Sequence, residues 1–179
     1  MLGLGVGSLK PEFDLLGLGG AEFTERGARG DDALRAIRAS FAERLPEYRG
    51  PYYDYSGFII DPCGVQQQVP MWIGGRSRRS LRRAVELAEG WMPFGLPPGD
   101  LRAMIDAARQ TEAWQARSKP LDLILRHEGR IDPMGDPAKA ADTIGGLFAI
   151  GATRYSVYLA AKSRARYIEQ LEALAELKV

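Results

Sequence analysis

Histidine and cysteine are nearly absent from this chain of 179 residues, which has only His127 and Cys63. A single cysteine excludes an internal disulfide framework and fits a reducing compartment. A single histidine excludes a His-rich metal site and leaves one candidate base for any Ser-His-Asp triad. Since neither residue stands in a cluster with metal-ligand spacing, the sequence predicts no metal site.

Long apolar runs and an excess of one charge are also missing. No segment approaches the roughly 18 apolar residues of a membrane-spanning helix. Met1 does not begin a signal peptide with a charged start and an apolar stretch. The formal net charge is +1, which gives no global attraction to nucleic acid or to anionic membranes. We therefore expect a cytoplasmic protein with neither kind of partner.

Apolar and charged residues occur at ordinary levels, 45% and 26%, which is typical of a globular domain. Short apolar runs alternate along the chain with segments of helical period. Such alternation indicates a parallel sheet covered by helices. We predict one α/β domain over residues 1–179, with strands at 1–7, 71–74, 91–94, 121–125 and 153–159.

A helix is expected after each predicted strand. The first should be capped by Asp31 or Asp32, direct its apolar side chains inward as far as Leu45, and stop at Pro46. The segments 10–30 and 48–69 are expected to be connections, the second with a short hairpin. The other helices are predicted from 78 to 89 with Gly90 closing it, after 97–100, from Asp136-Pro137 to Gly151, and from Ser163 with Ile168, Leu171 and Leu174 inward.

The turn Ile73-Gly-Gly-Arg-Ser77 is the most informative candidate site. A strand that ends in two glycines and opens a helix presents free backbone N–H groups at a positive dipole end, which suits a phosphate. Gly74, Gly75 and Ser77 would then surround the phosphate, with Arg76 as a charge partner. Alternatively, the glycines make a tight turn and Ser77 caps the helix. Both interpretations stay open here.

The run Gly3-Leu-Gly-Val-Gly7 lacks the G-x-G-x-x-G spacing, and no acidic residue follows at the proper distance. It is therefore a poor dinucleotide fingerprint. At the mouth of a barrel strand, however, Gly5, Gly7 and Ser8 would let the backbone approach a ligand.

Several other residues have two possible explanations. The arginines at 76, 78, 79, 82 and 83 form a basic cluster, but Arg79, Arg82, Arg83 and Glu86 share one helical side and predict a solvated face better than a nucleic-acid site. His127 follows a predicted strand, and we expect a loop histidine there. Trp91 and Phe94 either wall a ligand pocket or pack in the core.

Short motifs spread over nearly the whole chain resemble the luciferase-like monooxygenase superfamily, and most closely its deazaflavin-using (coenzyme F420) branch. Asp32 stands where that family usually has Glu. The resemblance is carried by the order and spacing of Leu2-Gly-Leu-Gly-Val-Gly7, Phe23-Thr-Glu-Arg-Gly-Ala-Arg-Gly-Asp-Asp32, Pro70-Met-Trp-Ile-Gly-Gly75, Glu89-Gly-Trp91, Gly135-Asp-Pro137 and Gly151-Ala-Thr153.

The resemblance implies a TIM barrel, which has eight strand–helix units and ~250 residues. This chain begins at what looks like the family's fourth strand. We therefore expect a partial (β/α)₈ barrel made of about the last five units, without the first three. Such a sheet would have two unpaired edges and an exposed apolar interior, which predicts a homo-oligomer.

The function implied by the resemblance is oxidation–reduction or monooxygenation of a small organic substrate with coenzyme F420 or, alternatively, FMN. Gly74, Gly75 and Ser77 would hold the cofactor phosphate. No catalytic acid or base is assigned, because those positions would lie mainly in the absent part of the barrel. The alternative is a non-catalytic truncated barrel that binds a cofactor or associates with other copies.

Overall fold

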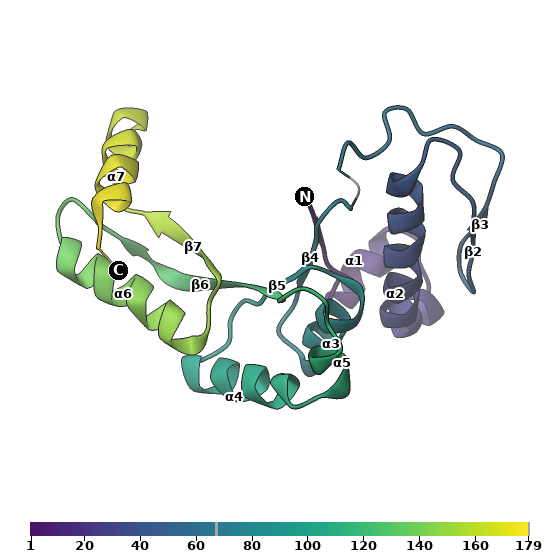
Figure 1. Ribbon diagram of the computed structural model, residues 1–179, viewed down its shortest axis with the longest axis horizontal. Helices are drawn as coiled ribbons and strands as arrows, with labels where there is room; N and C mark the ends of the chain where they lie inside the picture. The colour runs from purple at the N-terminus through teal and green to yellow at the C-terminus, as the bar shows by residue number, and fades with distance from the viewer. Residues whose placement is uncertain (67, 179) are drawn as a thin grey trace.

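A computed structural model describes residues 1–66 and 68–178 of the chain. Five parallel strands form its main sheet, in the order β1 (Leu2–Leu4), β4 (Met71–Gly74), β5 (Gly90–Met92), β6 (Asp122–Ile131) and β7 (Arg154–Leu159). Their spatial order is their order along the chain (Figure 1). The predicted α/β alternation with a parallel sheet is therefore confirmed.

The helices that follow β4, β5 and β6 lie on one side of this sheet (Figure 1). The sheet does not close: within the described residues, β1 and β7 each pair with a single strand. The molecule is thus an open wall of five strand–helix units. The helices from β4 onward are α3 (Arg78–Leu87), α4 (Pro98–Arg109), α5 (Glu112–Gln115), α6 (Pro137–Ile150) and α7 (Arg164–Glu176).

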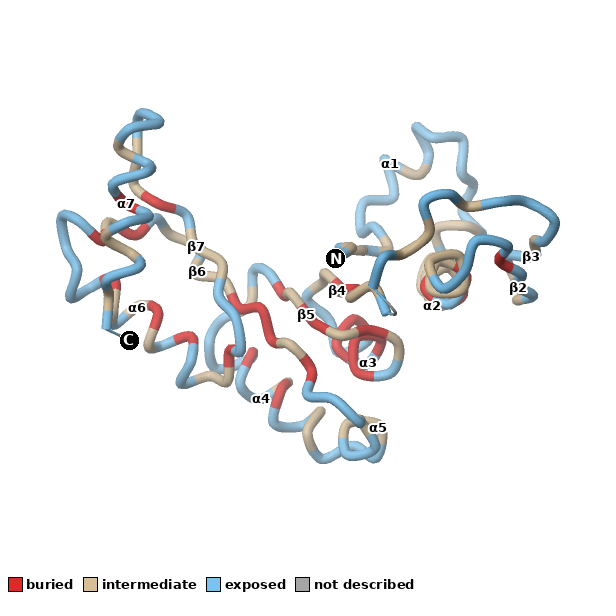
Figure 2. Tube along the Cα trace, turned by 45° about the horizontal axis from the view of Figure 1, so that its top comes forward, coloured by how far each residue is buried: buried red, intermediate tan, exposed pale blue. Residues whose placement is uncertain are grey.

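The main core lies between the sheet and these helices. Alternate strand residues point toward it, among them Ile73, Trp91 and Leu125, each at most 2% exposed. They pack against the buried faces of α3 and α4, including Leu81 and Ile105. The buried positions follow β4, α3, β5 and the first part of β6 (Figure 2). A second, smaller core lies farther along the chain between β6, α6 and β7.

The segment after β1 differs from the prediction. Residues 10–30 are not irregular: α1 (Lys10–Leu15) is followed by α2 (Gly20–Ala42). Two glycines obscure the helical pattern but let α2 approach its neighbours, because a Cβ at Gly30 would lie 2.4 Å from Val6 Cγ1 and one at Gly27 3.3 Å from Arg83 Nη2. Packing thus outweighs the poor helix propensity of glycine. Since α2 ends at Ala42, Leu45 is exposed rather than inward.

Asp32 lies in the middle of α2 and is buried, so the prediction that Asp31 or Asp32 caps the helix is wrong. Its carboxylate instead holds the predicted hairpin, β2 (Tyr48–Arg49) and β3 (Asp54–Tyr55). It accepts hydrogen bonds from the Tyr48 hydroxyl at 2.5 Å and from the backbone N–H groups of Tyr52 and Tyr53 at 2.9 and 3.1 Å. The carboxylate therefore fixes the hairpin against α2.

Two predicted boundaries are wrong near β5. The strand ends at Met92, so Phe94 lies beyond it and is exposed. Gly90 does not close α3, which ends at Leu87, but is the first residue of β5. Its missing side chain gives room to Trp72 of β4, because a Cβ at Gly90 would lie 2.5 Å from Trp72 Cδ1.

The last units also differ from the prediction in places. β6 runs on to Ile131, so His127 lies within a strand and not in a loop. Gly151 ends α6 with φ +112°, as predicted. Of the three residues of α7 predicted to point inward, Leu174 packs against the smaller core, whereas Ile168 and Leu171 are exposed. The buried residue of that helix is Gln170.

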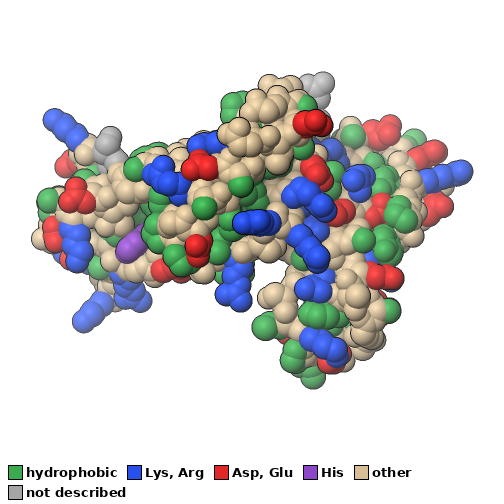
Figure 3. All heavy atoms as spheres, turned by 90° about the horizontal axis from the view of Figure 1, so that it is seen from below, with side chains coloured by type: hydrophobic (Ala, Val, Ile, Leu, Met, Phe, Trp, Pro, Cys, Tyr) green, Lys and Arg blue, Asp and Glu red, His purple; other side chains and the backbone are tan. Residues whose placement is uncertain are grey.

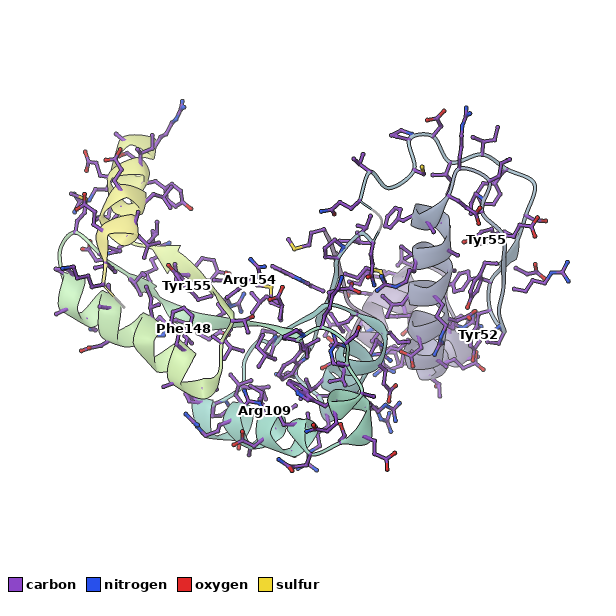
Figure 4. All side chains as sticks on the ribbon, in the orientation of Figure 1. Tyr52, Tyr55, Arg109, Phe148, Arg154 and Tyr155 are labelled. Atoms are coloured by element: carbon purple, nitrogen blue, oxygen red, sulfur yellow. The ribbon has the colours of Figure 1, made fainter. Side chains whose placement is uncertain are left out.

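The sheet face turned away from the helices carries charged pairs beside the apolar side chains of Trp72 and Ile124, which corrects in part the expectation of an exposed apolar interior. Arg154 pairs with Asp122, with Nε and Oδ2 3.0 Å apart, and its guanidinium lies 5.8 Å from the centre of the Trp72 ring. Figure 4 shows Arg154 on the face of the sheet that the helices leave open, whereas Tyr155 lies beside Phe148 on the α6 side. Arg126 on the same face contacts Glu128 and Tyr158.

None of the helices within the described residues has the length and apolar character that a membrane span requires.

Candidate functional site

The turn between β4 and α3 has the geometry of a capped helix start. Gly75 has φ +133°, and a Cβ there would lie 2.8 Å from Ser80 Cβ, so glycine is needed. The Ser77 hydroxyl accepts from the Ser80 N–H at 3.2 Å, and the Ser80 hydroxyl accepts from the Ser77 N–H at 3.2 Å. This reciprocal capping box confirms that the segment is a tight turn with Ser77 as N-cap.

The cap leaves other N–H groups of this turn available. The first N–H groups of a helix have no intrahelical acceptor, and here those of Arg78 and Arg79 belong to exposed residues. Arg76 and Ser77 are also exposed, and Gly74 and Gly75 are partly exposed. An anion at this turn would meet backbone donors at the positive end of α3. Capping and anion binding are therefore compatible.

Gly5 lies next to this turn, because Leu4 pairs with Ile73 and the following residues on the two strands are Gly5 and Gly74. A Cβ at Gly5 would meet nothing within 4 Å. Packing therefore does not require glycine there, and a close approach to the backbone remains open.

Gly7 has a local structural reason to be glycine. Its φ is +74°, and a Cβ would lie 2.8 Å from the Phe13 ring of α1. Its carbonyl accepts a hydrogen bond from Arg26 Nε at 3.2 Å. Gly7 thus permits the turn from β1 toward α1.

A cavity of about 340 Å³ lies beside the end of β1, between that strand and the first two helices. Gly5, Phe13 and Ile73 line it together with Arg26 and Arg29 of α2. The Arg26 guanidinium lies 4.0 Å from the Phe23 ring centre, and Arg29 pairs with Glu25 at 3.1 Å. No role was predicted for these arginines individually. They belong to the arginine-rich segment 23–32, which is one of the motifs that carry the family resemblance.

A polar network joins the loop after β5 to the middle of β6. Glu128 accepts from the Gly95 N–H at 3.0 Å and from Arg126 Nη2 at 3.0 Å. The Gly95 hydrogen bond, with help from Arg126, lowers the pKa of Glu128. Arg126 Nη1 also reaches the Tyr158 hydroxyl at 3.2 Å. This network was not predicted, because the strand was expected to end at Leu125.

Trp91 belongs to the core and does not wall a pocket. It is fully buried, and its indole Nε1 donates to Ser80 Oγ at 3.2 Å, below the turn. Phe94 is exposed.

The predicted solvated arginine face is right for Arg82 and wrong for Arg83. Arg82 is exposed and lies 3.7 Å from Glu86. Arg83 is buried, pairs with Asp31 and donates to the Gly27 carbonyl at 3.0 Å, because α2 packs over it. Basic and acidic side chains are interspersed over the face drawn in Figure 3.

His127 lies in β6, and its imidazole occupies the space beside Gly129, where a Cβ would be 2.7 Å from Nε2. Among residues 1–66 and 68–178, no three His, Cys, Asp or Glu side chains gather as metal ligands.

Comparison with known proteins gives one family and a set of similar folds. The family model described as luciferase-like monooxygenase matches residues 1–172. No similar sequence was found among curated proteins.

Two solved structures with the same fold are a bacterial monooxygenase and a reductase from Methanopyrus kandleri. The monooxygenase RslO1 from Streptomyces bottropensis has a TM-score of 0.71 at 15% identity, covering 98% of this chain and 66% of its own. The coenzyme F420-dependent tetrahydromethanopterin reductase from Methanopyrus kandleri has a TM-score of 0.65 at 14% identity, covering 99% of this chain and 74% of its own.

An F420-dependent secondary alcohol dehydrogenase, solved with an F420–acetone adduct, has a TM-score of 0.57 at 15% identity, covering 99% of this chain and 61% of its own. At these identities the likeness shows the fold. This chain spans about two thirds of the length of these proteins.

Proposed function

Because the chain belongs to the luciferase-like monooxygenase family, we propose that it forms part of an oxidoreductase that uses coenzyme F420, or FMN in its place, on a small organic substrate. The observation that carries this proposal is the Gly74–Ser77 turn, which opens α3 at the carboxyl end of a parallel strand. Ligand sites of α/β barrels lie at that end of the sheet.

The phosphate of either cofactor would lie against this turn. Gly74 and Gly75 lack side chains that could block a ligand, the first residues of α3 are exposed, and the exposed Arg76 adds a positive charge. Gly5 lies beside Gly74, where β1 ends next to β4. When bound, the cofactor supplies the hydride chemistry, and the protein positions and orients it.

Ser77 offers a test that separates phosphate binding from helix capping. Asp and Asn cap helices about as well as Ser. Ser77→Asp should therefore leave stability nearly unchanged but weaken binding by placing a carboxylate against the phosphate. Ser77→Asn is the matched neutral control and should bind nearly as the parent does. Titration of the purified chain with F420 and with FMN, followed by fluorescence, measures both.

Gly74→Ala provides a second variant at the same turn. A Cβ there would lie 3.6 Å from the Leu4 carbonyl oxygen, which is ordinary contact, so the fold should persist. The added methyl group should weaken cofactor binding. If neither cofactor binds, or if Ser77→Asp and Gly74→Ala bind like the parent, the cofactor site is disproved.

A second candidate is a non-catalytic module that binds a cofactor or associates with other copies of itself. It is favoured by the free edges of β1 and β7 within the described residues, which present unpaired backbone groups. Turnover assays with reduced F420 or reduced FMN separate the two candidates. Cofactor binding without any turnover of a substrate panel would support the module.

A further inference from the structure

A groove of about 860 Å³ lies between α2, α3 and α5. It includes Gln68, Glu89 and Lys119, which come shortly before β4, β5 and β6. The groove therefore lies at the edge where strands begin, opposite the Gly74–Ser77 turn. We call it the α2–α5 groove.

The floor of this groove is apolar and is formed in part by small side chains. Leu34, Val85 and Ala88 are buried at 2 to 4% exposure, and Ala39 and Ala113 are partly exposed. Alanine side chains leave a hollow that larger residues would fill.

The carboxylates beside the groove are already neutralised. Glu89 accepts hydrogen bonds from Arg38 Nη2 at 2.9 Å, Gln68 Nε2 at 2.8 Å and the Met71 N–H at 2.8 Å. Glu86 faces Arg82 at 3.7 Å. Each of these acidic groups thus has a basic neighbour, with the closer pairing at Glu89.

The negative end of the α3 dipole also borders the groove, and Arg117 covers it. Its guanidinium donates to the Val85 carbonyl, to the Ala88 carbonyl at 3.0 Å and to the Ala84 carbonyl at 3.4 Å. Burial lowers the pKa of Arg117, but an arginine stays protonated at neutral pH. This cation thus compensates the free carbonyls at the end of α3.

Two cations on the rim remain accessible. Arg35 is exposed and gives one Nη1 hydrogen bond, at 3.2 Å, to the Asp31 carbonyl one turn back in α2. Lys119 is exposed, and its ammonium has no hydrogen-bond or ion-pair partner among the described residues. The groove thus combines an apolar floor with a basic rim.

We propose that the α2–α5 groove binds a small amphipathic carboxylate. Its apolar part lies on the floor of Leu34, Val85 and Ala88, and its carboxylate lies at the basic rim of Arg35 and Lys119. The burial of an alkyl chain and charge-assisted hydrogen bonds would both contribute to binding. This inference is independent of the proposed function, because it concerns the opposite edge of the sheet.

Octanoate is the probe, and octylammonium, with the same alkyl chain and the opposite charge, is its matched control. Amide chemical shifts of the isotope-labelled chain report where each binds. Octanoate should give saturable shifts at Ala39, Ala113 and Ala116, whereas octylammonium should bind much more weakly. The double variant Arg35→Ala/Lys119→Ala should weaken octanoate binding about tenfold, as expected for a charged hydrogen bond.

Two further variants keep the test interpretable. Ala113→Leu retains every rim charge but fills the floor, and it should also weaken octanoate binding. Lys162→Ala removes an exposed lysine outside the groove and should have no effect. Shifts scattered over the surface, equal binding of octanoate and octylammonium, or no saturation at millimolar octanoate would overturn the proposal. Titration with F420 or FMN reports on the other edge, so the two proposals can fail separately.

Discussion

Asp32 shows how one buried carboxylate can organise a long connection. It lies on α2 and holds β2 and the turn of the β2–β3 hairpin through Tyr48 and the backbone of residues 52 and 53. Burial alone would raise the pKa of Asp32, but these hydrogen bonds together hold that pKa below its ordinary value. Figure 4 shows Tyr52 and Tyr55 of this segment beside α2.

The lowered pKa predicts acid sensitivity. A carboxylate whose pKa is lower in the folded state stabilises the fold above its unfolded pKa, about 3.9, and this stability is lost as the pH falls through the folded pKa. Asp32→Asn should therefore destabilise the protein at pH 7 and flatten the loss of stability on acidification. Urea unfolding of both proteins from pH 7 to pH 3 measures this. Parallel pH profiles would contradict it.

Substitution of two adjacent arginines of α3 should change stability by very different amounts. Arg83 is buried between α2 and α3, with Asp31 and the Gly27 carbonyl as partners. Arg82 is exposed and faces only Glu86. Arg83→Ala would leave buried acceptors without a donor and should cost about 2–4 kcal/mol of unfolding free energy.

Arg82→Ala is the matched control and should change stability by less than about 0.5 kcal/mol. Denaturant unfolding of the two variants compares them directly. Equal losses would show that the α2–α3 contact does not depend on Arg83.

At the scale of elements, α7 is held by a buried amide as well as by Leu174, which packs against the smaller core. Gln170 is fully buried; its Oε1 accepts from the Met134 N–H at 3.1 Å, and its Nε2 donates to the Ala160 carbonyl at 3.0 Å and to Asp132. The hydrogen bond from Gln170, with one from the Gly135 N–H, lowers the pKa of Asp132. The amide thus links α7 to the segments after β6 and β7.

Gln170→Ala should loosen α7 without unfolding the main core. Its loss leaves a buried N–H unsatisfied, at a cost of about 1–3 kcal/mol. Hydrogen exchange should quicken in α7 and stay unchanged in α3. Glu172→Ala, at an exposed position of the same helix, is the control. Unchanged exchange in α7 would contradict this role.

Regular elements were predictable where apolar periodicity and capping residues agree. Asp136-Pro137 and Gly151 bound α6 as the sequence indicates, and Ser163 caps α7. The start of α2 was missed because its first turns contain glycines and charged residues, and their packing partners Val6 and Arg83 are distant in sequence. The polar end of β6 was missed because only its pairing with β7 makes it a strand.

The candidate site was also predictable only in part. Local sequence identified the Gly74–Ser77 turn and its cap. The Gly95–Glu128–Arg126–Tyr158 network joins β6 and β7 to the loop after β5, and no local pattern contains it.

At the scale of the whole molecule, the free edge of β7 predicts association. Its six residues include the exposed Tyr155 and Tyr158 and no lysine or proline, and its one charged residue, Arg154, is paired with Asp122. Light scattering at micromolar concentration should detect a homo-oligomer. Tyr158→Lys should shift it toward the monomer, whereas Lys162→Ala, outside the strand, should not. A stable monomer of the parent chain would refute this prediction.

The charged pairs on the open face of the sheet bear on how such a wall could be completed. The pairs Arg154–Asp122 and Arg126–Glu128 stand where a closed barrel has its central axis. Any further strands that curved over them would have to admit water or supply hydrogen-bonding groups of their own, because charges sealed in a dry lumen are costly. A segment with a purely aliphatic surface would therefore not fit against these two charged pairs.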